Sequence, residues 1–129
     1  DAIGANISAK KAYCLHPLVQ GHQDLEANWL TVSRTCSGDA ILLAMEYRNI
    51  ANSFLSDKIP GHEQIILSPL RDVNQMLIAD KVQNKKDFVK YHQGKHPRSH
   101  ELTVYFDLWL DALDVSAQMY QHLCKLIDV

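Results

Sequence analysis

The chain has few cysteines and glycines and no excess of positive charge. Three cysteines in 129 residues, with no C-x-x-C spacing, argue against a disulfide framework and indicate reduced thiols. A disulfide between two of them is the alternative. A formal net charge of −2 argues against a general nucleic-acid binder, which needs a basic excess to follow phosphates. No glycine-rich loop suited to cradling phosphates appears either.

Long apolar runs are absent as well. No segment approaches the roughly 18 apolar residues that a membrane span requires. Residues 1–6 lack the charged and apolar regions of a signal peptide, so we expect a soluble, cytoplasmic protein with no membrane partner. A chain of 129 residues buries roughly two thirds of its surface on folding, which is enough for one domain over residues 1–129.

The sequence does contain apolar residues at spacings of three and four along most of its length. Alternating β-branched runs are missing, so we predict an all-α fold. Helix-start signals, each a proline or a capping side chain, occur at these positions: Pro17, Ser37, Ser68 with Pro69, Ser99 and Asp114. We expect a helix to follow each of them, with one over residues 40–55 and a break at residues 58–61.

The predicted helix after Ser68 carries the most informative polar residues. Asp80 and Asn84 are four residues apart, so they share a face that also holds Leu77. A carboxylate on an apolar side needs a partner, which a metal ion or a basic side chain would supply, while a position at the solvated rim stays open. Lys81 and Lys85 belong to a basic stretch suited to a small phosphorylated ligand.

Two motifs resemble those of SpoT-type HD-domain hydrolases, which remove the 3'-pyrophosphate from guanosine alarmones. Tyr13-x-x-His16-Pro17 is similar to their Y-x-x-H-P segment, and Ala79-Asp80-Lys81-x-x-Asn84 is similar to their A-D-K-L-x-N segment. The aromatic run at residues 105–109 looks like that of the small single-domain members. Residues 45–52 and 96–99 resemble HD-like proteins of tailed bacteriophages, and residues 48–53 more weakly resemble the R-N-x-x-x-H motif of HEPN ribonucleases.

The resemblance implies a compact, all-α HD-type domain. It also implies that His16 and Asp80 are two ligands of a divalent metal, usually Mn²⁺, and that Asn84 contacts the nucleotide. Such an ion activates water near neutral pH and screens the charged phosphate. Without the resemblance, His16 beside a proline is usually a packing or capping residue, and it becomes a ligand only where other donors converge on it.

The departure from the family lies in residues 42–49. The family has L-L-H-D-x-x-E-D there, whereas this chain has no His-Asp pair and carries Arg48 and Asn49 in place of the acidic pair. Glu46 is the remaining oxygen donor of this segment and hence a catalytic candidate, while Met45 is a poor ligand for a hard ion. We expect Arg48 to pair with Asp80 or to bind phosphate, and an ordinary surface arginine is the alternative.

These features support one leading hypothesis and two alternatives. The leading one is a degenerate SpoT-like domain that binds a phosphorylated guanosine nucleotide or a protein partner without hydrolysis and without a cofactor. The first alternative is an active nucleotide pyrophosphohydrolase with an altered Mn²⁺ site, and the second is a phage-encoded protein that acts on a host protein. The residues expected around one cleft are His16, Glu46, Arg48, Asp80 and Asn84, with Lys81 and Lys85 as further nucleotide ligands.

Overall fold

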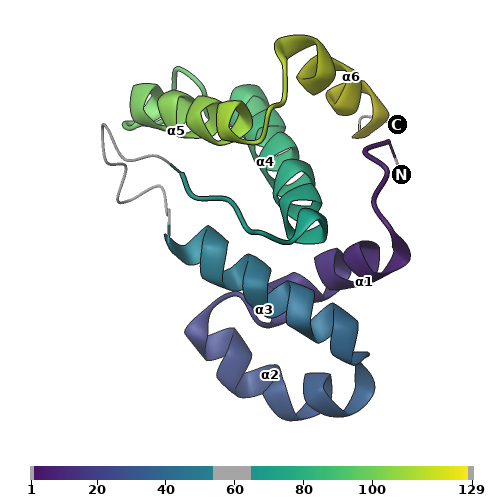
Figure 1. Cartoon of the computed structure of the whole chain (residues 1–129). Coiled ribbons are helices and arrows are strands. Elements are labelled where there is room, and N and C mark those ends of the chain that lie inside the picture. The colour runs from purple at the N-terminus through teal and green to yellow at the C-terminus, as the bar shows by residue number, and fades with distance from the viewer. Residues whose placement is uncertain (1, 54–64, 128–129) are drawn as a thin grey trace. The chain divides into compact units, whose positions relative to one another are not determined.

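The computed structural model describes residues 2–53 and 65–127, and their regular secondary structure is entirely helical (Figure 1). The prediction of an all-α fold is therefore confirmed for these residues. The helices are α1 (Ile7–Leu15), the 3-10 helix η1 (His16–Leu18), α2 (His22–Thr35), α3 (Gly38–Ser53), α4 (Arg71–Tyr91), α5 (Ser99–Ala112) and α6 (Ala117–Ile127). Among the described helices, none combines the length and the apolar character that crossing a membrane requires.

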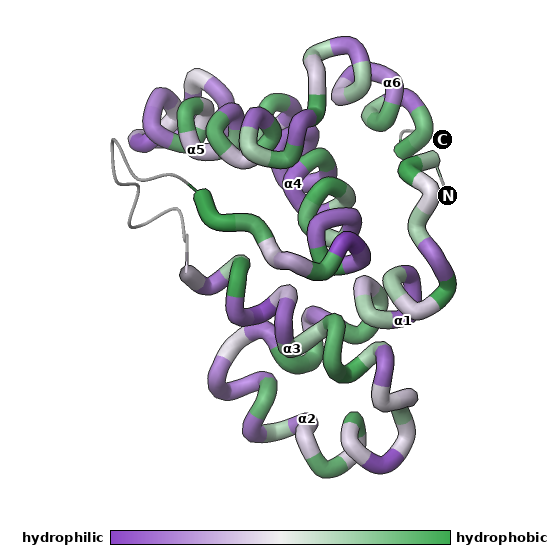
Figure 2. The backbone as a smooth tube through the Cα atoms, in the orientation of Figure 1, coloured by the Kyte–Doolittle hydropathy of each residue, from purple (hydrophilic) through white to green (hydrophobic). Residues whose placement is uncertain are grey.

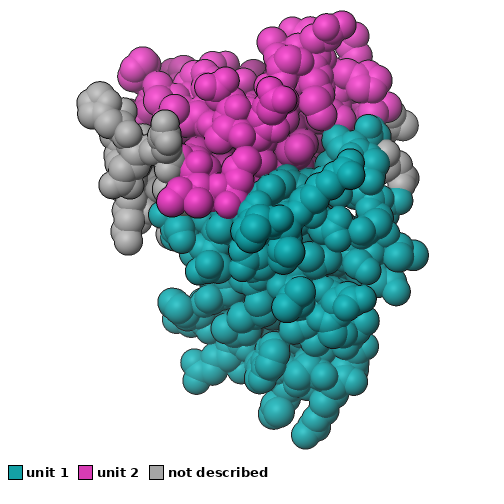
Figure 3. All heavy atoms as spheres, viewed as in Figure 1, with its two compact units in different colours: residues 1–53, 68–76 teal, residues 54–67, 77–129 magenta. Residues whose placement is uncertain are grey.

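The chain divides into two compact units, coloured separately in Figure 3. Unit 1 comprises residues 1–53 and 68–76, and unit 2 comprises residues 54–67 and 77–129. The division falls within α4, whose first residues belong to unit 1 and whose remainder belongs to unit 2. The single domain expected from the chain length stays a prediction.

In unit 1, α1 packs along α3, and η1 links α1 to α2. The facing sides of α1 and α3 bury small residues, Ala9 and Ala12 on one helix and Ala44 and Ala51 on the other. Small side chains at a contact allow two helix axes to approach closely. Helix α2 buries only Val32, and Figure 2 shows that polar residues cover much of the rest of it.

In unit 2, the core forms where α4 meets α5 and α6. The rings of Phe88 on α4 and Phe106 on α5 lie 5.6 Å apart between centroids, and Trp109 of α5 is fully buried. Helix α6 contributes Leu123 to the buried residues. These aromatic side chains are among the largest residues buried around the second half of α4.

Three of the predicted helix starts are confirmed or nearly so. The Ala40 N–H donates to Ser37 Oγ, as expected of a capping serine, and α5 begins at Ser99. Helix α4 begins at Arg71 rather than at Pro69, although Ser68 Oγ accepts a hydrogen bond from the Leu70 N–H. Such a shift of two residues is common at helix ends. The expected end of a helix at residue 55 and the break at residues 58–61 lie outside the described residues.

Two predicted starts are wrong. Pro17 lies within η1, and the helix expected there begins at His22, because the Val19 N–H closes a tight turn onto the His16 carbonyl. Asp114 does not cap the last helix. It has a positive φ of 59° that closes α5, and Ser116 caps α6 instead by accepting from the Met119 N–H.

Candidate functional site

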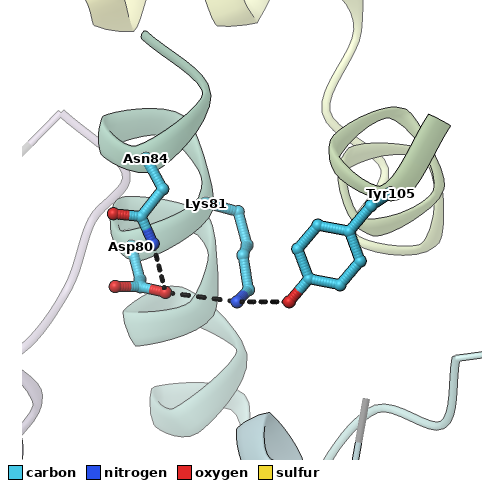
Figure 4. Close-up of polar contacts among 4 residues, drawn as sticks. All are labelled: Asp80, Lys81, Asn84 and Tyr105. Atoms are coloured by element: carbon cyan, nitrogen blue, oxygen red, sulfur yellow. Dashed lines mark hydrogen bonds and ion pairs between the residues drawn. The ribbon is translucent and has the colours of Figure 1, made fainter. Parts of the chain in front are cut away.

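Asp80, Lys81, Asn84 and Tyr105 form a hydrogen-bonded group in unit 2 that we call the α4 polar cluster (Figure 4). Asn84 Nδ2 donates to Asp80 Oδ2 over 3.2 Å, which confirms that the two side chains share a helix face. Lys81 Nζ lies 3.3 Å from the same oxygen of Asp80. It also donates to the Tyr105 hydroxyl of α5 over 3.4 Å. The carboxylate of Asp80 therefore has an ammonium and an amide as partners within its own helix.

Lys81 is the most deeply placed charge in this cluster. Only 5% of the residue is exposed, and its ammonium lies 4.7 Å from the centre of the Trp109 ring. Removing an ammonium from water is costly unless charges and hydrogen bonds replace the water. The Asp80 carboxylate, the Tyr105 hydroxyl and the face of Trp109 together provide that replacement. A phosphate bound at Lys81 would have to compete with all three.

Lys85 lies one turn further along α4 in a similar but more open setting. Its ammonium is 3.0 Å from Asp107 Oδ1 and 4.4 Å from the centre of the Tyr120 ring on α6. Burial raises the pKa of the Tyr120 phenol, and a hydrogen bond with Cys124 raises that pKa further. Lys81 and Lys85 thus both have an acidic partner and an aromatic one.

His16 in unit 1 is packed between two tyrosines. Its ring centroid is 4.9 Å from that of Tyr13 and 4.7 Å from that of Tyr47, and the residue is buried. Nδ1 donates to the Tyr13 carbonyl, so the lone pair of the neutral ring is on Nε2. Both the packing role and the ligand role considered for this histidine are compatible with that geometry.

Arg48 on α3 is half-buried and contacts His22, which no sequence pattern marks as a site residue. Its Nη2 donates to His22 Nδ1 over 2.7 Å, which requires the neutral form of the imidazole. Among the described residues, no acceptor faces Arg48 Nε, although this N–H is buried. A buried guanidinium N–H without an acceptor is costly, and an anionic oxygen would satisfy it.

Glu46 on α3 is held by the segment that precedes α4. Its Oε1 accepts a hydrogen bond from Ser68 Oγ over 3.1 Å. The backbone of Ser68 is fixed in turn by the amide of Asn74, which accepts from its N–H and donates to its carbonyl. Glu46 therefore links α3 to the segment that precedes α4 within unit 1, and among the described residues no donor faces its remaining oxygen.

The predicted site residues fall into both units. His16, Glu46 and Arg48 belong to unit 1, whereas Asp80, Lys81, Asn84 and Lys85 belong to unit 2. That they line one cleft, and that Arg48 pairs with Asp80, stay predictions. In the part of the chain that the structure describes, no three His, Cys, Asp or Glu side chains converge as metal ligands.

The residues do not fit the manganese centre that the family resemblance implies. At two of the four ligand positions the chain carries Ala44 and Met45, which offer no hard donor, and at a third the Asp80 carboxylate is occupied by Lys81. We therefore derive no catalytic step through a metal ion.

Comparisons of the chain with protein-family models, with curated proteins and with solved structures found no match. The likeness to SpoT-type hydrolases accordingly remains a hypothesis carried by the motifs around His16 and Asp80.

Proposed function

We propose that this chain is a degenerate SpoT-like HD domain that binds a phosphorylated guanosine nucleotide without hydrolysing it. The main support is the pairing of the Asp80 carboxylate, which occupies the last ligand position of the motif. Lys81 and Asn84 already neutralise and bond this carboxylate. A divalent ion at Asp80 would have to displace an ammonium that is itself buried against Trp109.

Arg48 supports the binding part of the proposal. Its guanidinium stands where the family carries an acidic residue, and it keeps a buried N–H with no acceptor in the described structure. Phosphate oxygens are the natural acceptors for such a group, since a guanidinium presents its donors in a planar fork. The exchange of an acidic residue for Arg48 also changes the local charge in the direction that favours an anion.

Titration of the chain with guanosine tetraphosphate, followed by calorimetry and thermal shift in the absence of divalent ions, tests this proposal. We expect saturable binding that Arg48→Met weakens by about tenfold or more, because one charge-assisted pair is lost. Arg34→Met is the matched control, since Arg34 is an exposed arginine on α2 of the same unit. Equal losses of nucleotide affinity in both variants would show that net charge explains the effect, and would refute a binding site at Arg48.

The same nucleotide separates the alternatives. Release of pyrophosphate that requires Mn²⁺ and disappears in Asp80→Ala would establish the hydrolase and refute binding alone. Absence of both turnover and binding would leave the alternative of a protein partner, as in a phage protein acting on its host.

A further inference from the structure

A shallow apolar groove runs along α3 in unit 1, and we call it the α3 groove. It consists of two adjoining cavities of about 470 and 370 Å³, which share Leu42 and Leu70. Ile41 and Met45 extend its apolar floor along the helix. Leu42 is 62% exposed, which is a large apolar exposure for a side chain at the centre of a concave surface.

The length of the groove suits a helix. Its α3 residues run from Gly38 to Asn49, which corresponds to about 16 Å, or three helical turns, at 1.5 Å per residue. Partner helices that lie in such grooves insert apolar side chains at every third or fourth position. Among the described residues there is no strand whose edge could pair with an extended peptide.

The charges at the groove select the partner. The cavities are lined by Asp39, Glu46 and Asp72 and by a single cationic side chain, Arg71. Two of the carboxylates are oriented by neutral donors: Ser68 Oγ donates to Glu46, and the Asn6 amide donates to both oxygens of Asp72 over 3.0 and 2.9 Å. Hydrogen bonds from neutral groups fix these carboxylates without cancelling their negative charge.

We propose that the α3 groove is a docking site for a basic amphipathic helix of a partner protein. The apolar side chains of that helix contact Leu42, Met45 and Leu70, while its lysines or arginines meet the acidic side chains around them. This interaction is distinct from the nucleotide binding proposed above: of the residues predicted around the nucleotide cleft it uses only Glu46, and it involves neither the α4 polar cluster nor Arg48.

A labelled leucine–lysine amphipathic helix of about 14 residues is a suitable probe, because it spans the groove with one turn to spare. Fluorescence anisotropy should show saturable binding that weakens with added salt. Leu42→Lys should weaken binding by about tenfold or more, as expected when a central apolar contact becomes a repelling charge. Leu30→Lys is the matched control, since Leu30 is 66% exposed on α2 and does not line the groove.

The proposal is overturned if the two lysine variants bind equally, because general electrostatic attraction would then explain the signal. It is also overturned if a leucine–glutamate helix binds as well as the leucine–lysine helix, or if neither helix binds. Sedimentation of the unlabelled chain supplies a further check. A dimer that Leu42→Lys dissociates would assign the groove to a second copy of this chain and would refute a separate partner.

Discussion

Replacing Lys81 by methionine isolates the charge at the centre of the α4 polar cluster. Methionine keeps most of the volume and still contacts the Trp109 ring, but Asp80 then loses its only ion-pair partner among the described residues. Breaking a fully buried ion pair by removing one side costs about 3–5 kcal/mol. The Asp80 side chain is 14% exposed and keeps its bond to Asn84, so we expect a loss of about 2–3 kcal/mol, at the lower end of that range or just below it.

Lys85→Met is the matched control on the same helix. Lys85 also combines an acidic and an aromatic partner, but its side chain is 20% exposed and that of Asp107 is 57% exposed. Exposed pairs of this kind contribute only about 0.2–1 kcal/mol. Both substitutions remove an ammonium that has an acidic and an aromatic partner, and Lys81→Met also removes the hydrogen bond to Tyr105, so the contrast measures burial together with that one bond.

Urea denaturation followed by far-UV circular dichroism and by Trp109 fluorescence in a Trp29→Phe background measures both losses. Asp80→Asn combined with Lys81→Met should recover part of the stability, because no unpaired charge then remains. The reasoning is refuted if Lys81→Met costs no more than Lys85→Met. It is refuted equally if the double variant is as unstable as the sum of the two single ones.

Three further predictions concern other contacts. Burial raises the pKa of Tyr120 above its ordinary value of 10.0, so the stability that this phenol contributes in its neutral form is present below that pH and is lost as pH rises beyond it. The urea midpoint of the Tyr120→Phe variant should therefore fall less between about pH 9 and pH 11 than the midpoint of the wild type. Ser68→Ala should cost about 1 kcal/mol in the same assay, because the Leu70 N–H and Glu46 lose a partner, whereas an unchanged midpoint would show that water replaces the hydroxyl. Trp109→Ala should cost about 3–5 kcal/mol, because the ring is fully buried, and a loss below about 2 kcal/mol would contradict its place in the core.

Spacing alone was sufficient to place Asp80 beside Asn84, because residues four apart on a helix must be neighbours. The same rule also marks Lys81, which lies four residues after Leu77 and seven before Phe88, both buried. We interpreted Lys81 as a phosphate ligand because of the lysines around it. Helical spacing therefore predicts that Lys81 is buried, but the basic composition of the segment favours the opposite interpretation, an exposed phosphate ligand.

The partners of these charges could not be predicted from the sequence. Tyr105 lies 24 residues from Lys81, and His22 lies 26 residues from Arg48. Contacts at such separations depend on how helices pack, and helical periodicity fixes only which face of a helix is buried. The wrong prediction at Asp114 has a more local cause. An aspartate can adopt the left-handed backbone conformation that ends a helix, and it can also cap the start of one.

The pairing within α4 shows how protein groups alone neutralise Asp80. A largely buried carboxylate is costly unless a cation and hydrogen bonds replace the water it has lost. Asp80, whose side chain is 14% exposed, has both kinds of partner because Lys81 follows it in the chain and Asn84 lies one turn later. Neutralisation is thus achieved by residues of one helix and requires no contribution from Arg48. In the domain we propose, stability and ligand binding consequently depend on different cations, with Lys81 stabilising the fold and Arg48 left to bind the phosphate.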